Sequence, residues 1–166
     1  MEVSEGGMRP GPDPFLRAEV VHSSERTRIT RLFLPGRTVI RKEPLGPDAE
    51  RRARHETAML ERLRGVAGVA QLAAAPRYPG SVVLEDAGEA SLAGLTTPLP
   101  AGELAGLGLG LAMAVAGMHR RGVIHLDITP ANVVVSGDGA PCLVDFALAT
   151  SVAHSRICGK SLNTPN

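Results

Sequence analysis

Three polar residues in the C-terminal third of the chain, Asp127, Asn132 and Asp145, have the types and spacing of a site that does chemistry. Two short apolar runs, 133–135 and 142–144, flank a turn-forming segment that contains Gly-Asp-Gly, which predicts an antiparallel hairpin. Asn132 directly precedes the first run and Asp145 directly follows the second. Strand pairing would therefore bring their Cα atoms to about 5 Å from each other.

Two side-chain oxygens at that separation suit Mg²⁺, which takes hard oxygen ligands and leaves room for waters and substrate phosphates. Asp127 lies five residues before Asn132, on a loop restrained by Pro130, and can lean over the same spot as a hydrogen-bond acceptor. Taken singly, each of the three is better explained as a turn residue, a strand-end cap or a surface carboxylate. Their combined spacing is more specific and favours the metal site.

Composition limits the classes of protein to consider. The chain has 166 residues, 43% of them hydrophobic, which is enough for one domain with a core. Its 18 basic and 17 acidic residues give no electrostatic reason to expect nucleic acid or a membrane surface as partner. Cys142 and Cys158 fit no metal or disulfide spacing, so we expect a cytoplasmic protein. The uncharged run 104–118 is shorter than the about 20 residues that span a bilayer.

The segment HLDITPAN, residues 125–132, resembles the catalytic loop of the protein kinase superfamily, His-Arg-Asp-x-x-x-x-Asn, and residues 145–147 resemble its Asp-Phe-Gly. The resemblance implies that Asp127 is the base that orients the attacking hydroxyl. It also implies that Asn132 and Asp145 hold Mg²⁺ on the phosphates of ATP. His125 is expected to support this loop and not to take part in the chemistry.

Three positions depart from the kinase pattern. Leu126 replaces an Arg that grips a phosphorylated activation loop, which suggests that loop phosphorylation does not activate this protein. Thr129 replaces a Lys that contacts the γ-phosphate, which weakens stabilisation of the transition-state charge. Ala147 replaces a Gly and stiffens the segment.

The N-terminal half supplies a candidate ion pair. Residues 18–22, 28–34 and 37–42 read as strands, and 48–64 reads as a helix with Asp48 as its N-cap. Glu56 lies on the apolar stripe of that helix with Leu60 and Leu63, where a buried carboxylate needs a partner.

The kinase resemblance supplies Lys42 as this partner, and Lys42 would also pair the α- and β-phosphates. The alternative is a surface pair between Glu56 and Arg52, one helical turn earlier, which would stabilise by only about 0.3 to 0.5 kcal/mol.

Two further segments would hold the nucleotide by the same resemblance. The join at 23–27 stands where kinases have a Gly-rich phosphate loop, so the hydroxyls of Ser24 and Thr27 would replace backbone donors. The strand 81–86 and the loose segment 87–89 resemble the hinge. Adenine would then be held by the backbone of Glu85 and Ala87. The adenine pocket would be lined by Ile40 and Leu84.

The remaining segments complete the expected order: a short strand at 69–74, a helical piece at 91–95, a linker at 96–100 and a long helix at 101–121. The expected buried stripe of the long helix consists of Leu104, Leu107, Leu111, Val115 and Met118. The histidines at 22, 55, 119 and 154 are expected to be structural or exposed.

The expected fold class is α+β and protein kinase-like, with an antiparallel β small lobe carrying one helix and the first part of a mainly helical large lobe. The expected parts are a flexible leader (1–14), a small lobe (15–86), a partial large lobe (87–150) and a disordered tail (151–166). No Ala-Pro-Glu motif follows residue 147, so we expect a truncated gene product, a frameshifted end or an artificially shortened chain.

The expected function is that of an ATP- and Mg²⁺-dependent Ser/Thr protein kinase, acting on a protein hydroxyl in signalling. One alternative is a truncated pseudokinase that binds a nucleotide or a partner. The other is a small-molecule phosphotransferase of the aminoglycoside or choline kinase kind, which also resembles His-x-Asp-x-x-x-x-Asn. The Lys42 strand and the Glu56 helix are more similar to a protein kinase.

Overall fold

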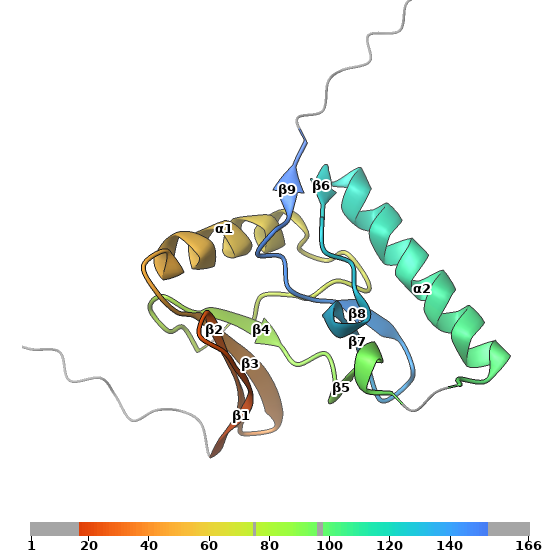
Figure 1. The fold of residues 1–166 in the computed structure, drawn as a ribbon, viewed down its shortest axis with the longest axis horizontal. Helices are drawn as coiled ribbons and strands as arrows, with labels where there is room; N and C mark the ends of the chain where they lie inside the picture. The colour runs from red at the N-terminus through yellow and green to blue at the C-terminus, as the bar shows by residue number, and fades with distance from the viewer. Residues whose placement is uncertain (1–16, 75, 96–97, 153–166) are drawn as a thin grey trace, which may run out of the picture.

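The computed structural model describes residues 17–74, 76–95 and 98–152. The predicted leader at 1–14, His154 and most of the predicted tail lie outside these residues, as do two residues of the 96–100 linker. Within them the chain forms a four-stranded antiparallel sheet with one helix against it, followed by a second helix and two small sheets (Figure 1).

The four-stranded sheet has the order β1-β2-β3-β4, and every neighbouring pair is antiparallel. Its strands are β1 (Arg17–Ser23), β2 (Thr27–Leu34), β3 (Arg37–Pro44) and β4 (Val82–Glu85). Gly36 closes the β2–β3 turn with a φ of +75°, a conformation that costs glycine little. The predicted strands are therefore confirmed within two residues at each end.

Helix α1 (Ala49–Arg62) packs on β3 and β4. The predicted stripe is buried: Glu56 is 1%, Leu60 2% and Leu63 0% exposed. Asp48 occupies the N-cap position but makes no side-chain cap hydrogen bond. Its carboxylate pairs instead with Arg51, at 3.2 Å.

The second part of the chain contains one long helix, α2 (Ala101–Arg120). Two sheets, β5-β7-β8 and β6-β9, lie beside it. Their strands are β5 (Ala90–Ser91), β6 (Val123–Ile124), β7 (Val133–Val135), β8 (Pro141–Leu143) and β9 (Thr150–Ser151). Short 3-10 helices cover Leu92–Gly94 and Pro130–Asn132. Strand β9 includes Ser151, the first residue of the predicted tail.

Three local predictions are wrong. The segment 69–74 forms only two isolated bridges, Val69 to Leu143 and Leu72 to Leu84, because it crosses between two sheets without running along either. Strand β8 begins and ends one residue earlier than expected. Leu104 is 59% exposed, because the burial of α2 begins only at Leu107.

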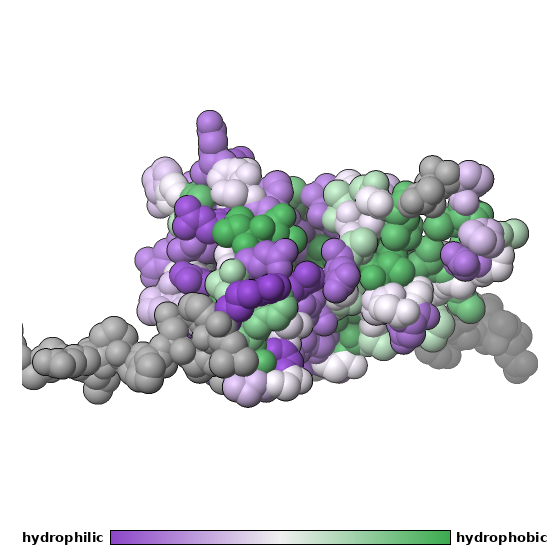
Figure 2. Space-filling view, turned by 90° about the horizontal axis from the view of Figure 1, so that it is seen from below, coloured by the Kyte–Doolittle hydropathy of each residue, from purple (hydrophilic) through white to green (hydrophobic). Residues whose placement is uncertain are grey.

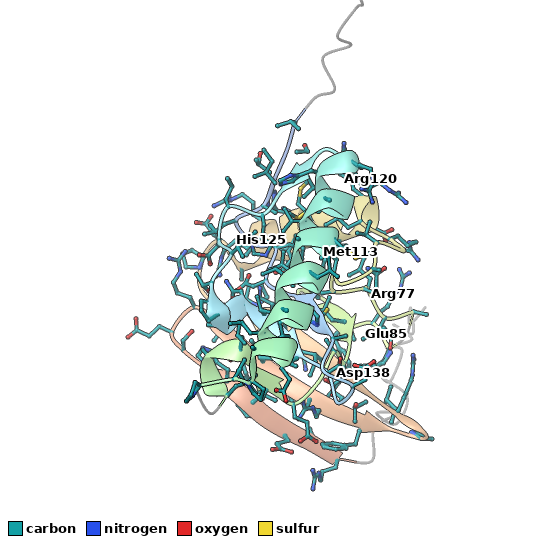
Figure 3. The ribbon with its side chains drawn as sticks, turned by 90° about the vertical axis from the view of Figure 1, so that its right-hand side faces the viewer. Arg77, Glu85, Met113, Arg120, His125 and Asp138 are labelled. Atoms are coloured by element: carbon teal, nitrogen blue, oxygen red, sulfur yellow. The ribbon has the colours of Figure 1, made fainter. Side chains whose placement is uncertain are left out.

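Helix α2 carries apolar side chains on two sides. Leu107, Ala114 and Met118 are buried, whereas Leu109 and Met113 are 66% and 65% exposed. In Figure 2 hydrophobic residues gather on the right of the view, where Figure 1 places α2, and Figure 3 shows Met113 on this helix. Helix α2 has 20 residues and is long and apolar enough to cross a membrane by length and composition alone. The expectation that the uncharged run 104–118 is too short to span a bilayer therefore does not hold for the whole helix.

One hydrophobic core joins the two parts of the chain. It includes side chains from α1, β4, α2 and β6 to β8, together with Phe146. The largest fully buried side chains in this core are Leu60, Leu63, Val82, Met118, Val123, Leu143 and Phe146. This shared core fixes the position of β3 and α1 relative to residues 125–147.

Candidate functional site

A cavity of about 560 Å³ lies between the four-stranded sheet and the segment around β7 and β8. It is lined by all the residues that the sequence predicts for the nucleotide and the metal: Ser24, Thr27, Ile40, Lys42, Leu84, Glu85, Ala87, Asn132 and Asp145. Glu56 and Asp127 are not part of its wall and lie beside wall residues. The sequence therefore predicted a set of residues that the fold brings together from five separate segments.

Lys42 joins the two parts of the chain at this cavity. Its Nζ donates to Glu56 Oε1 at 2.9 Å and to Asp145 Oδ1 at 2.5 Å. Lys42 is 5% and Glu56 1% exposed, so each charge depends on the other for compensation. The predicted pair of Lys42 and Glu56 thus forms, while Arg52 binds the backbone oxygens of residues 26 and 45 instead.

The two carboxylates around Lys42 have opposite pKa shifts. Burial raises the pKa of Glu56 above its usual range, and the nearby Lys42 ammonium offsets only part of this effect. Burial also acts to raise the pKa of Asp145, but the charge of Lys42 and its hydrogen bond outweigh burial. The pKa of Asp145 therefore lies below its usual range, and this carboxylate stays ionised at neutral pH.

Asn132 is oriented by Asp127. Its Nδ2 donates to the backbone oxygen of Asp127 at 3.0 Å and to Asp127 Oδ2 at 2.9 Å. This assignment leaves Asn132 Oδ1 as an acceptor toward the cavity. Because β8 ends at Leu143, Val144 is the residue opposite Asn132, and its N–H donates to Asn132 O at 2.9 Å. Asp145 thus sits one residue beyond the predicted pairing.

The side-chain oxygens present at this site fit Mg²⁺ as ligands. Asn132 Oδ1 and Asp145 Oδ2 are hard oxygens with no hydrogen-bond donor among the described residues, whereas Asp145 Oδ1 already binds Lys42. In the described ranges no three His, Cys, Asp or Glu side chains gather into a metal site. The protein would therefore supply two ligands and leave the rest to waters and phosphates, as is usual for Mg²⁺.

His125 holds the loop from inside, as expected. The side chain is 1% exposed, its Nε2 lies 2.9 Å from Val144 O, and its Nδ1 accepts from the Asp127 N–H at 3.2 Å. The ring also packs edge-on against Phe146, with centroids 4.6 Å apart. Both ring nitrogens therefore hold the loop, and the contact of Nδ1 with the Asp127 N–H positions Asp127.

The β1–β2 turn is closed by its own hydrogen bonds. Ser24 Oγ accepts from the N–H groups of Thr27 at 3.1 Å and Arg26 at 3.3 Å, and it donates to Thr27 O at 3.3 Å. Ser24 and Thr27 line the cavity as predicted. However, the Ser24 hydroxyl and two of the backbone donors that a phosphate would need are already bonded within the turn.

Of the two hinge residues predicted to hold adenine, Glu85 and Ala87, only Ala87 has a backbone N–H without a partner among the described residues. The Glu85 N–H donates to Gln71 O at 2.9 Å, so it faces away from an adenine ring. The Ala87 N–H makes no hydrogen bond with any described residue, and Ala87 lines the cavity. If adenine binds here, Ala87 is the residue that can donate to it.

Sequence reasoning missed an ion pair in the cavity wall. Arg31 and Asp86 both line the cavity, and Arg31 Nε donates to Asp86 Oδ2 at 2.7 Å. The two residues are 55 positions apart in the sequence, so no local pattern reveals the pair. Arg31 follows Ile29, which also lines the cavity, by two positions on β2, and residues two apart on a strand share a face.

The antiparallel sheet with α1 is compatible with the small lobe of a protein kinase, and sequence comparisons point the same way. The chain is 38% identical over 60 residues to the serine/threonine-protein kinase AfsK of Streptomyces coelicolor, which covers 36% of this chain and 7% of that protein. It is 48% identical over 46 residues to the probable serine/threonine-protein kinase mkcF of Dictyostelium discoideum, covering 28% and 7%.

A longer match is to the serine/threonine-protein kinase PknB of Mycobacterium leprae, 29% identical over 107 residues and covering 52% of this chain and 17% of that protein. No protein-family model matches. The matched part thus spans less than a fifth of each of these relatives. The comparisons support a kinase-like relationship for part of the chain.

Proposed function

We propose that this protein is an ATP-dependent phosphotransferase of the Ser/Thr protein kinase type, which moves the γ-phosphate to a protein hydroxyl. The observation that carries the proposal is the double contact of Lys42 with Glu56 and Asp145 at the cavity wall. A buried cation at a cavity, bonded to two carboxylates whose pKa values are shifted, is typical of a functional site. The partial similarity to Ser/Thr kinases supports the same reading.

Seven of the predicted site residues have a role in this proposal. Ile40 and Leu84 pack against adenine while the Ala87 N–H donates to it, and Lys42 binds the phosphates. Asn132 and Asp145 hold Mg²⁺, which when bound neutralises phosphate charge. The oxygen of the substrate hydroxyl attacks the γ-phosphorus and ADP leaves, while Asp127 accepts the proton of that hydroxyl.

The test separates binding from transfer. Titration calorimetry with Mg²⁺-ATP should show binding to the unmodified chain and much weaker binding to Lys42→Met. Asp127→Asn should bind normally but lose about 100-fold or more in phosphate transfer to a Ser/Thr peptide library, as expected for removal of a general base. Asp48→Asn, an exposed change at the start of α1, is the control. Absence of Mg²⁺-ATP binding by the unmodified chain would overturn the proposal.

A second candidate is a protein that binds a nucleotide without transferring phosphate. The closed β1–β2 turn favours it, because the N–H groups of Arg26 and Thr27 are satisfied by Ser24 Oγ. The titration and the peptide transfer measurement together decide between the two candidates. Mg²⁺-dependent nucleotide binding with no phosphate transfer to peptides supports this one.

A further inference from the structure

Arg31 makes three side-chain hydrogen bonds in the cavity wall. On β2, its Nε donates to Asp86 Oδ2 at 2.7 Å, and its Nη2 donates to Gly88 O at 2.8 Å and to Asp86 Oδ1 at 3.4 Å. Asp86 Oδ1 also accepts from the Gly88 N–H at 3.2 Å. The side chains of Arg31 and Asp86 are only 14% and 11% exposed. A planar guanidinium bonded in two directions fixes the orientation of the chain that it binds.

Gly88 carries this contact to the other part of the chain. Its φ is +147°, and a Cβ at this position would lie 2.7 Å from Val135 O and 3.1 Å from Ser136 Cα. The backbone of Gly88 is therefore packed directly against β7, where only glycine fits. Arg31 thus ties the four-stranded sheet, through residues 86–88, to the strand next to Asn132.

We propose that Arg31, Asp86 and Gly88 form a latch that positions the hinge backbone for adenine and thereby sets nucleotide affinity. This inference deepens the proposed function and rests on it. The N–H of Ala87, which lies between the two latched residues, has no described partner to hold its direction. The latch supplies that restraint on both sides, so it lowers the ordering cost of binding.

A nearby ion pair provides a matched control. Arg37 on β3 also reaches the hinge, where Arg37 Nη1 lies 3.3 Å from Glu85 Oε1, but these side chains are 42% and 45% exposed. Exposed pairs are screened by water and contribute little. Arg37 does not line the cavity. Replacing Arg37 removes a charge pair between the sheet and the hinge without touching the latch, so it controls for the loss of such a pair in general.

The experiment compares two ligands by titration calorimetry. Arg31→Met and Asp86→Asn should weaken the binding of adenosine and of Mg²⁺-ATP by the same factor, on the order of tenfold, because both ligands use the hinge. Lys42→Met should weaken Mg²⁺-ATP and leave adenosine unchanged. Arg37→Met should match the unmodified chain with both ligands. Thermal unfolding of each variant without ligand shows whether its fold is kept.

The outcomes separate this inference from the proposed function. Folded latch variants that bind adenosine as tightly as the unmodified chain overturn the latch and leave the proposed function standing. An unmodified chain that binds neither ligand overturns both. If Arg31→Met does not fold, Arg31→Lys keeps the charge but not the bidentate contact. Arg31→Lys should then bind adenosine more weakly than the unmodified chain does. Adenosine affinity equal to that of the unmodified chain overturns the latch.

Discussion

Leu126 and Asp145 are the two non-glycine residues with positive φ in the described ranges, at 67° and 63°. Asp tolerates this left-handed region, and Asp145 Oδ1 is bonded to Lys42 and to the Ala147 N–H. Leu126 has no such compensation and its side chain is 64% exposed. Strain of this kind persists at sites where the surrounding structure imposes it. Here the buried ring of His125, directly before Leu126, fixes the loop.

The strain at Leu126 predicts that Leu126→Asn stabilises the protein. A left-handed L-residue costs about 1 to 2 kcal/mol, which Asn largely avoids, so we expect the unfolding free energy to rise by about 1 kcal/mol. Urea unfolding followed by circular dichroism measures it. Ile128→Asn, an exposed neighbour without positive φ, is the control and should not stabilise. Equal effects of the two substitutions would contradict the strain argument.

The lowered pKa of Asp145 predicts a pH dependence. A carboxylate with a lower pKa in the folded state contributes stability that is present above its unfolded pKa, about 3.9, and lost as pH falls through the folded value. The stability difference between the unmodified chain and Asp145→Asn should be constant from about pH 5 to 7 and shrink below about pH 4. Glu56, whose raised pKa has the opposite sign, is present in both chains. Its contribution cancels only in part, because burial raises that pKa, Lys42 lowers it and the Asp145 charge raises it further. A difference that grows in acid would contradict this assignment.

At the scale of elements, α2 forms although it contains several glycines. Its glycines differ in environment: a Cβ on Gly108 would meet nothing within 4 Å, whereas one on Gly110 would lie 2.7 Å from Pro141 Cγ. Pro141 begins β8, so Gly110 is the point where the helix approaches that strand. Glycine is needed for this close approach, whereas Gly106 and Gly108 face open space.

Two substitutions test this difference. Gly108→Ala should raise the unfolding free energy by about 1 kcal/mol, the helix-propensity difference between Ala and Gly. Gly110→Ala gains the same propensity but collides with a rigid proline ring, and overpacking costs about 1 to 3 kcal/mol, so it should be no more stable than the unmodified chain. Denaturant unfolding of both variants is the measurement. A stabilising Gly110→Ala would show that α2 and β8 are less closely packed.

The elements that the sequence predicted well have strong local signals. The three N-terminal strands and α1 follow from alternation, turn residues and an apolar stripe. A buried carboxylate at Glu56 needs a partner, and the kinase resemblance implied that this partner is Lys42. The failures involve long-range packing. Neither the isolated bridges of residues 69–74 nor the exposure of Leu104 has a local signature, because each depends on which segment lies opposite. The ion pair of Arg31 and Asp86 was not predicted, for the same reason.

At the scale of the whole molecule, Phe146 connects the site to the core. Its side chain is 0% exposed, its ring packs against His125, and its N–H donates to Glu56 Oε1 at 3.2 Å. It belongs to the cluster that also contains Leu60 of α1 and Met118 of α2. The two parts of the chain therefore share one core, and we expect them to unfold together.

Phe146→Ala tests this shared core. Emptying a fully buried aromatic site costs about 3 to 5 kcal/mol, a large fraction of the stability of a typical domain. Amide hydrogen exchange should accelerate equally in β2–β4 and in α2, because both lose the same global protection. Leu109→Ala, at a 66% exposed position of α2, should change stability by less than about 0.5 kcal/mol. If α2 alone lost protection while the sheet kept its own, the two parts would be independent folding units, and Lys42 would be held near Asp145 by the cavity contacts and not by the core.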